Sequence, residues 1–242
     1  MGTEIERHGV VKMIILDGIN INNHNMYLVE DRPPVPTAQQ DTEQFVIRGR
    51  NGSLTKKYAY LDIPYPLNLA IYDNVSFKPA FRKGKQVLFS AKKLAFEDEP
   101  EIYYKIKSVQ IDIAENDVEE FGQFTVNFTL DPFAYEETDT ITITQQTTLS
   151  NTGYESEPYI KAHATGTGKV YIGEQVITIK DVNGTIEIDS TMMNAYRNEN
   201  GLITNLNNKM IGDFPVLVEG NNRISFDGDI TKLEINPRWR WI

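Results

Sequence analysis

Six cations and no acid lie between residues 78 and 93, which makes this segment a basic run (Lys78, Arg82, Lys83, Lys85, Lys92 and Lys93). A basic cluster is typical of a surface that binds an acidic partner, and the solvated face of an amphipathic helix has the same composition. The run therefore predicts a helix face in solvent or a contact with an acidic protein, for example a second copy of this chain. Binding of nucleic acid is a third interpretation.

The last residues alternate arginine with tryptophan and contain both tryptophans of the chain (Arg238, Trp239, Arg240, Trp241). Exposed, this pattern suits an interface hot spot, a platform for stacking a sugar, or cation–π pairs. In a terminal strand, the same alternation points both tryptophans into the core and both arginines out. The alternation favours the terminal strand.

Motifs for catalysis and metal binding are scarce. The chain has no cysteine and three histidines (His8, His24, His163), and it contains neither G-x-S-x-G nor H-E-x-x-H. The acidic stretches 97–99 and 227–229 lack the spacing of a calcium-binding loop, and residues 48–52 lack that of a phosphate-binding loop, so all three predict turns. We therefore predict no enzyme, with no catalytic, cofactor-binding or metal-binding residues.

Composition narrows the class of protein further. The chain has 242 residues, of which 40% are hydrophobic, so it can form a core. Its net charge is −10, so it repels phosphate backbones. No apolar run of about 18 residues exists, which predicts no membrane-spanning helix. The apolar stretch 10–16 is interrupted by Lys12, so we expect no signal peptide and synthesis in the cytoplasm.

Alternation of apolar and polar residues dominates the chain and predicts many short strands with one buried face. The alternating segments are 103–113, 123–130, 140–143, 169–172, 176–179, 185–188, 223–226 and 232–235. Val182-Asn183-Gly184 predicts a hairpin turn between two of these strands, and Asp227-Gly228-Asp229 predicts a turn at the end of another. The pattern indicates a mainly β chain of sandwich-type domains.

Two segments interrupt the strands. Residues 76–90 have apolar side chains at helical spacing, with Ser76 as N-cap and Pro79 in the first turn, and predict one short helix. Residues 30–43 contain three prolines and predict an extended arm or loop before a strand at 45–47. Pro132 and the acids after it predict a domain boundary, giving domains 1–137 and 138–242; the last strand could instead join the first domain.

The order of short motifs over nearly the whole chain resembles the distal tail proteins (Dit) of long-tailed, non-contractile bacteriophages. Each motif alone is common, and the resemblance rests on their order and spacing. Two departures are Asn51, where the family more often has Asp, and the twelve residues before Met13, which look like an extension. In chain order the motifs are Arg48-Gly49-Arg50-Asn51-Gly52, Phe96-Glu97-Asp98-Glu99-Pro100, Tyr103-Tyr104-Lys105, Asp131-Pro132-Phe133-Ala134-Tyr135, Asn151-Thr152-Gly153, Gly212-Asp213-Phe214-Pro215 and Pro237-Arg238-Trp239.

The resemblance implies a structural role. Members of this family form hexameric rings that join the end of the tail tube to the tail tip or baseplate. Their N-terminal domain, with an extended arm or hairpin and a helix, builds the ring, and their C-terminal domain is a galectin-like sandwich. For this chain it implies a virion location at the tail tip and no membrane contact, with DNA passing through the ring without specific binding. The implied partners are copies of itself, the tail tube protein, a tail-tip or tail-associated protein and a receptor-binding protein.

We expect the helix and the arm to supply the contacts between subunits, because both interrupt the first domain. The candidate residues are Phe77, Phe81, Lys83, Lys85, Leu88, Pro33, Pro34 and Pro36. The alternative function is a carbohydrate-binding or adhesion protein that contacts host cell-surface glycans. In that case a sugar would stack on Tyr154, Tyr159, Tyr171 or a tryptophan.

Overall fold

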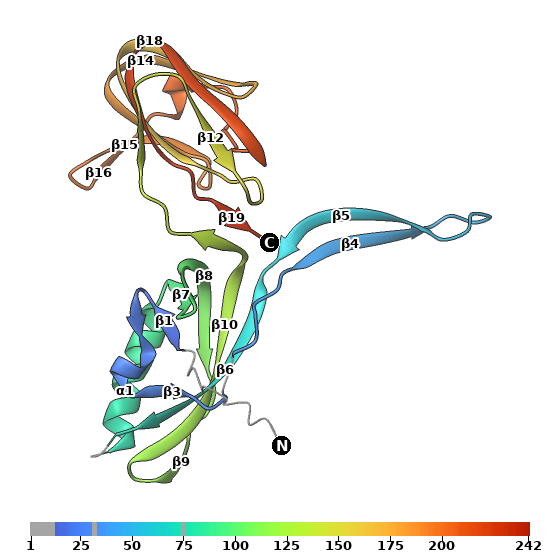
Figure 1. Cartoon of the computed structure of the whole chain (residues 1–242), viewed down its shortest axis with the longest axis vertical. Coiled ribbons are helices and arrows are strands. Elements are labelled where there is room, and N and C mark those ends of the chain that lie inside the picture. The colour runs from blue at the N-terminus through green and yellow to red at the C-terminus, as the bar shows by residue number, and fades with distance from the viewer. Residues whose placement is uncertain (1–12, 31–32, 74–75) are drawn as a thin grey trace, which may run out of the picture. The chain divides into compact units, whose positions relative to one another are not determined.

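A computed structural model describes residues 13–30, 33–73 and 76–242 of the chain. It is mainly β, which confirms the predicted fold class (Figure 1). The chain separates into two compact units, residues 1–134 together with Ile242, and residues 135–241. Neither α1 nor the 3-10 turns in the described ranges are long and apolar enough to cross a membrane.

The first unit contains a sheet with the strand order β2-β1-β7-β8-β10-β6-β3, and β9 pairs with β10 beside this path. The strands pack one face against α1 (Phe77–Ser90), and a 3-10 turn, η1 (Ile21–His24), connects β2 to β3. Their bounds are β1 (Ile14–Leu16), β2 (Ile19–Asn20), β3 (Met26–Leu28), β6 (Ile63–Tyr72), β7 (Lys93–Phe96), β8 (Glu99–Ile111), β9 (Glu115–Val118) and β10 (Phe121–Glu136).

The core of the first unit follows from alternation in β6 and β10. These strands pair in antiparallel register from Phe121 opposite Tyr72 to Leu130 opposite Ile63, and every second residue of each is buried. Pro64 and Pro66 fit into β6 because they can only occupy ladder positions whose backbone faces away from β10. Because proline has no amide hydrogen, the edge of β6 that faces away from β10 lacks two donors at Pro64 and Pro66. This discourages pairing with a further strand.

Helix α1 covers the core side of this sheet, and the prediction of a helix over 76–90 is confirmed. Ser76 is the N-cap in extended conformation, and the buried face carries Phe77, Ala80, Gly84 and Leu88. Gly84 has a packing role, because a Cβ there would lie 3.2 Å from both the Ile71 Cδ1 and the Met26 Sδ atoms. With a larger side chain, Ile71 and Met26 would have to shift to make room, which accounts for a weak helix former at this position.

A two-stranded hairpin extends from the first unit, formed by β4 (Gln39–Val46) and β5 (Ser53–Leu61). Only Asp62 separates β5 from β6, so the hairpin continues the central sheet outward (Figure 1). The arm or hairpin expected in the first domain is therefore a hairpin, and the predicted bounds 30–43 are wrong. The arm is a hairpin over residues 39–61, and it includes the predicted strand at 45–47.

The second unit is a two-layered β structure with the main strand order β11-β18-β13-β14-β15-β16. Strand β12 pairs with β18, β17 pairs with β14, and β19 pairs with the end of β10. The bounds are β11 (Ile141–Ile143), β12 (Thr147–Asn151), β13 (Tyr159–Ile172), β14 (Gln175–Asp189), β15 (Asn194–Glu199), β16 (Leu202–Asn205), η2 (Asn207–Lys209), β17 (Met210–Ile211), β18 (Gly220–Asn236) and β19 (Arg240–Trp241).

Three long strands, β13, β14 and β18, bend at one level and contribute to both layers. One half of β18 pairs with β11 and the other half with β12, and β14 is shared in the same way between β15 and β17. The bend falls at a register shift beside Gly166 and Gly168, with Gly228 opposite at φ +67°. Strands that change layer need bulges and small residues at the corner.

This corner corrects two predicted turns. Val182-Asn183-Gly184 lies inside β14 and Asp227-Gly228-Asp229 inside β18, so neither ends a strand. Both sequences do require unusual backbone angles, since Gly184 has φ +108°. Turn residues mark the bend of a continuous strand here, and the true hairpin turn between β13 and β14 is at Gly173 (φ +58°).

Pro132, at the predicted domain boundary, does not end a strand. Strand β10 continues through it to Glu136, and its pairing with β6 stops at Leu130. Beyond Leu130, β6 no longer pairs with β10, so no carbonyl of β6 requires the amide that Pro132 lacks. The division between the two compact units falls within β10, between Ala134 and Tyr135.

Candidate assembly interface

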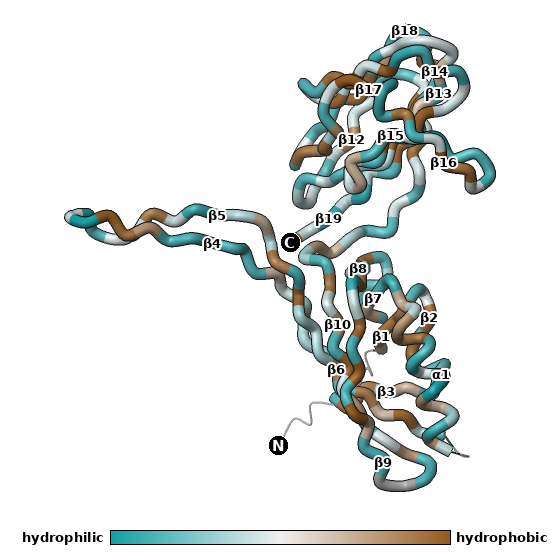
Figure 2. Tube along the Cα trace, turned by 180° about the vertical axis from the view of Figure 1, so that it is seen from behind, coloured by the Kyte–Doolittle hydropathy of each residue, from teal (hydrophilic) through white to brown (hydrophobic). Residues whose placement is uncertain are grey.

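The hairpin contains the longest continuously exposed segment of the described chain. Every residue from Asp41 to Ala59 is exposed to solvent. Its large apolar side chains are unusually open, with Val46 at 85%, Ile47 at 45% and Phe45 at 43% exposure. Figure 2 shows apolar stretches on both strands. An isolated two-stranded hairpin is marginally stable in water, and open apolar side chains mark interaction sites.

The hairpin ends in a tight turn made by Ile47-Arg48-Gly49-Arg50. The Arg50 amide donates to the Ile47 carbonyl at 3.1 Å, and Gly49 has φ +85°, the conformation that the third residue of this turn type needs. The prediction of a turn at 48–52 is confirmed. Because the glycine makes the reversal, the two arginines project from the turn without distorting it.

The base of the hairpin is fixed to the sheet by polar and aromatic contacts. Lys107 on β8 donates to Asp62 at 2.6 Å and lies 3.6 Å from an Asp131 carboxylate oxygen on β10. Burial opposes the charge of Lys107, and the two carboxylates outweigh it and raise its pKa. Above this triad, the rings of Tyr60 and Phe133 meet edge to face at 6.0 Å. These contacts hold the direction in which the hairpin leaves the sheet.

Charge divides along the hairpin. Residues 44–57 carry four cations and no acid (Arg48, Arg50, Lys56 and Lys57). Arg48 and Arg50 lie at the turn, whereas Lys56 lies on β5 opposite Glu43 of β4. The Tyr58 hydroxyl donates to the Glu43 carboxylate at 2.6 Å, and the Lys56 Nζ atom lies 4.6 Å from the centre of the Tyr58 ring. The turn and the residues beside it are therefore both apolar and basic, in a chain of net charge −10.

The structure divides the candidate residues on α1 into core and surface. Phe77 and Leu88 are 3% and 0% exposed and pack inside the first unit, so the interface interpretation does not extend to them. Phe81 stacks on Phe77 at 5.1 Å and meets Phe124 at 4.9 Å, which leaves it half-buried. Lys83 is exposed, and Lys85 lies 4.9 Å over the Phe81 ring. The exposed face of the helix is therefore basic.

The candidate prolines precede the hairpin, and Pro33 and Pro34 border a cleft. Pro33 and Pro36 are buried and Pro34 is exposed. The Tyr65 hydroxyl donates to the Pro34 carbonyl at 2.7 Å, which ties this segment to β6. The cleft is lined by Pro33, Pro34, Val35, Phe96, Asp98, Glu99 and Tyr104.

The C-terminal alternation has the opposite sense from the prediction. Arg240 is 7% exposed and donates to the Glu155 carbonyl at 2.7 Å and to Glu157 at 3.2 Å, whereas Trp239 and Trp241 are only half-buried. Arg238 makes two hydrogen bonds to Asp189, at 2.8 and 2.9 Å. A buried guanidinium is stable where acceptors surround it, and alternation alone does not reveal acceptors distant in sequence.

The tyrosines considered for sugar binding are not gathered in one place. Tyr159 and Tyr171 lie at opposite ends of β13, and each of the three already has a protein partner. Arg238 lies 5.7 Å over the Tyr159 ring, Arg240 lies 5.9 Å over Tyr154, and the Tyr171 hydroxyl donates to Asp227 at 2.8 Å. These contacts leave no shared aromatic platform among the three.

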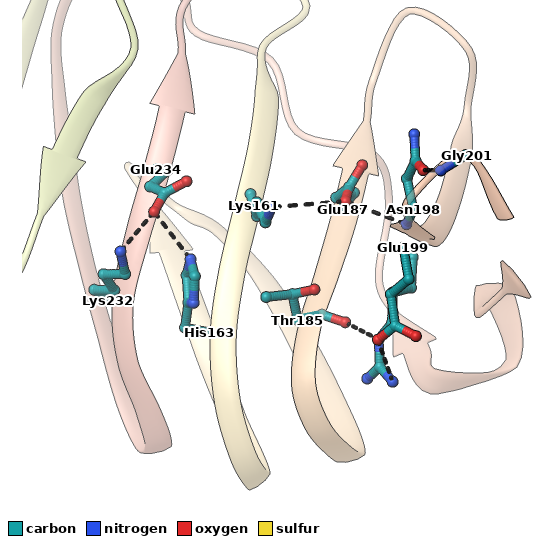
Figure 3. A network of polar contacts seen from close by, with 10 residues as sticks. Lys161, His163, Thr185, Glu187, Asn198, Glu199, Gly201, Lys232 and Glu234 are labelled. Atoms are coloured by element: carbon teal, nitrogen blue, oxygen red, sulfur yellow. Dashed lines mark hydrogen bonds and ion pairs between the residues drawn. The ribbon is translucent and has the colours of Figure 1, made fainter. Parts of the chain in front are cut away.

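One outer face of the second unit carries a network of paired charges (Figure 3). Glu234 accepts from Lys232 at 2.6 Å and lies 3.0 Å from His163, and Glu187 lies 3.9 Å from Lys161. The Lys232 and His163 contacts outweigh burial and lower the pKa of Glu234. Within the described ranges no group of three or more acids and histidines is arranged to hold a metal ion.

Sequence reasoning missed β5 and β6. Residues 63–71 alternate Ile, Tyr, Leu, Leu and Ile with other residues, which is a clear strand signal, and the glycine-rich turn between 45–47 and 53–61 is a hairpin signal. These two signals together could have located the hairpin. Nothing in the sequence indicates that it projects into solvent.

Comparisons with known proteins reveal the fold. No family model matches the chain, and no curated protein matches it. A Dit protein of phage SPP1, described as a paradigm of the hub adsorption apparatus in phages that infect Gram-positive bacteria, is similar in structure with a TM-score of 0.66 and 14% identity, covering 96% of this chain and 100% of that chain.

A chain of the phage P2 baseplate in its activated conformation with calcium is similar with a TM-score of 0.57 and 11% identity, covering 96% of this chain and 98% of that chain. A chain of the same baseplate with strontium is similar with a TM-score of 0.56 and 12% identity, covering 93% of this chain and 96% of that chain. The protein therefore has the fold of phage tail hub and baseplate components. Within that class its fold is that of a Dit protein, and the resemblance seen in the sequence is confirmed at this level.

Proposed function

We propose that this chain is a structural, non-enzymatic hub protein of a phage tail, located at the tail tip. The match in fold to the SPP1 Dit protein, over 96% of this chain and the whole of that one, carries the proposal. The exposed hairpin supports it, because basic and apolar side chains open to solvent need a partner in the finished assembly.

We propose that six copies form a ring through their first units. The hairpin of one copy contacts a different surface on the next, and head-to-tail contacts of this kind close into a ring when the rotation is right. The basic face of α1, with Lys83, is a second contact in this ring. The remaining partners proposed are the tail tube protein, a tail-tip or tail-associated protein and a receptor-binding protein.

Light scattering and negative-stain microscopy of the purified full chain test the ring. We expect a mass of about six times 27.6 kDa and ring-shaped particles. A variant in which residues 41–59 are replaced by a short Gly-Ser turn should remain monomeric. A full chain that stays monomeric at several hundred micromolar, without rings, contradicts the proposal.

The matched control removes exposed apolar side chains from the other unit. Leu202 and Ile203 on β16 are 71% and 63% exposed, and their replacement by Ser should leave the ring intact. For α1, Lys83→Glu together with Lys85→Glu should reduce the ring population at low salt, because reversed charges repel an acidic neighbour. An unchanged ring would remove α1 from the interface.

A further inference from the structure

We propose that Arg48 and Arg50, at the turn of the hairpin, bind the acidic cleft beside Tyr104 on a neighbouring copy of this chain. This inference rests on the proposed ring, because it names the surface of the next subunit that receives the hairpin. The argument starts from the cleft and then identifies the side chains that fit it.

The cleft has aromatic walls held in a fixed arrangement. Phe96 meets Tyr65 edge to face at 6.4 Å and Tyr104 at 6.2 Å, and the hydrogen bond from Tyr65 to the Pro34 carbonyl fixes the opposite wall. Two carboxylates, Asp98 and Glu99, complete the lining. Aromatic rings beside carboxylates suit a guanidinium group, which is planar. It can stack on a ring and form paired hydrogen bonds with a carboxylate.

The electrostatics of the cleft favour a cation. Residues 97–101 read Glu-Asp-Glu-Pro-Glu, four acids in five residues. Burial and the nearby Glu99 carboxylate raise the pKa of Tyr104, and burial together with Tyr104 and Glu30 raises that of Tyr65. A negative potential raises the pKa of a tyrosine, so both shifts are in the direction expected in an acidic cleft. Such a potential attracts guanidinium groups.

The hairpin turn supplies unpaired guanidinium groups. The second unit's arginines are engaged, since Arg197, Arg223, Arg238 and Arg240 all donate to oxygen acceptors within their own unit. In the described first unit, Arg48, Arg50 and Arg82 form no side-chain contact with another described residue. Arg48 and Arg50 alone lie at the end of a projecting element.

Geometry directs the arginines to another copy. An eight-residue strand such as β4 spans about 26 Å at about 3.3 Å per residue, so the turn lies far from Gln39 at the base. The cleft in the same chain begins at Pro33, just before that base, and a paired hairpin cannot fold its turn back onto it. A unit of about 120 residues has a radius of gyration of about 14 Å, so the hairpin spans much of a neighbour.

Cysteine cross-linking tests the contact in the full chain, which has no native cysteine. With Arg50→Cys and Glu99→Cys in one chain, mild oxidation should give disulfide-linked dimers and higher multiples on a non-reducing gel. Arg82→Cys with Glu99→Cys reports on α1 as the occupant, and Arg50→Cys with Lys180→Cys measures random collisions at an exposed site. A yield for the 50–99 pair no higher than for the 50–180 pair overturns the inference, and so does a higher yield for the 82–99 pair.

Charge exchange provides the second measurement. A chain with Arg48→Glu and Arg50→Glu, and a second chain with Asp98→Lys and Glu99→Lys, should each associate at least tenfold more weakly than the unchanged protein. Mixed in equal amounts they should assemble again, because each altered hairpin then meets a cleft of opposite charge. Arg32→Ala tests the cation next to Pro33 in sequence, and a loss of assembly from that variant with none from the hairpin variants overturns the inference.

The outcomes separate this inference from the proposed function. Rings that form in the unchanged protein but give no 50–99 cross-link and no rescue on mixing retain the hub proposal and reject the cleft. Absence of rings together with absence of the 50–99 cross-link rejects both. Rescue on mixing supports both.

Discussion

At the scale of single residues, the C-terminal arginines show how the second unit holds the end of its chain. Arg238 binds Asp189 through two hydrogen bonds, and Arg240 is buried against a carbonyl and a carboxylate. Gly153 makes room for this arrangement, because a Cβ there would lie 2.4 Å from the Arg240 carbonyl oxygen. The sequence motif Asn-Thr-Gly thus has a packing role that its letters alone do not show.

Replacing Arg238 by Gln should lower the free energy of unfolding of the second unit by about 2–4 kcal/mol. The Asp189 side chain is 6% exposed, and an almost buried carboxylate that loses its cation costs about this much. Denaturant unfolding followed by fluorescence measures the change. Arg223→Gln is the control, because Arg223 donates to the neutral Gln146 at an exposed site, and it should cost less than about 0.5 kcal/mol. A loss below 1 kcal/mol for Arg238→Gln contradicts the assignment.

The same pair gives a pH dependence. Burial opposes ionisation of Asp189, but Arg238 and the amides of Met192 and Thr191 outweigh it and hold the pKa below the ordinary 3.8. A carboxyl with a lowered folded pKa stabilises the protein above its unfolded pKa, and this contribution is lost as the pH falls through the folded pKa. Unfolding measured from pH 5 to pH 2.5 should show a smaller loss of stability below about pH 4 in Arg238→Gln than in the unchanged protein. An equal loss in both proteins contradicts it.

At the scale of elements, strands with one buried face could be predicted from alternation, and the helix could be predicted from its apolar spacing and N-cap. The corner of the second unit could not, because Asn-Gly and Asp-Gly fit a hairpin turn and a bent strand equally well. The difference depends on whether a partner strand bends at the same level, and that partner is distant in sequence. The candidate interface was predicted in part: its turn and prolines were identified, and its second strand was not.

The corner predicts a large effect of a small substitution. Gly228→Ala should destabilise the second unit by more than about 2 kcal/mol, because φ is +67° and the new Cβ would lie 2.5 Å from the Thr167 carbonyl oxygen. Gly173→Ala is a matched control, with φ +58° and nothing within 4 Å, so only backbone strain of about 1 kcal/mol is added. Chemical unfolding of both variants measures the difference. Equal losses would show that packing at the corner is unimportant.

The hairpin should contribute little to the stability of the first unit. All residues from 41 to 59 are exposed, so replacing them with a short turn removes almost no buried apolar area. The midpoint of thermal unfolding of the monomer should change by less than about 3 °C. As a control, Phe128→Ala in the core, where Phe128 is 2% exposed, should cost about 3–5 kcal/mol. A drop as large as that of the control would show that the hairpin packs on its own unit.

At the scale of the whole molecule, the net charge of −10 governs the response to DNA. The cations of the hairpin and α1 form two small basic surfaces in an acidic chain, so few phosphates can be neutralised together. Duplex DNA should not shift the protein in an electrophoretic assay at about 0.15 M salt, although weak binding should appear at about 0.02 M. Retention at the higher salt would contradict the expectation from the resemblance that DNA passes through a ring of this protein without specific binding.

The continuity of β5 with β6 has a mechanical consequence. A tensile load applied at the hairpin turn runs along β6, and the ladder from Ile63 opposite Leu130 to Tyr72 opposite Phe121 carries it in shear. Shear stretches many backbone bonds at once, whereas peeling would break them one after another. If neighbouring subunits pull on each other through the hairpin, the load is therefore carried by the whole β6–β10 ladder of the first unit.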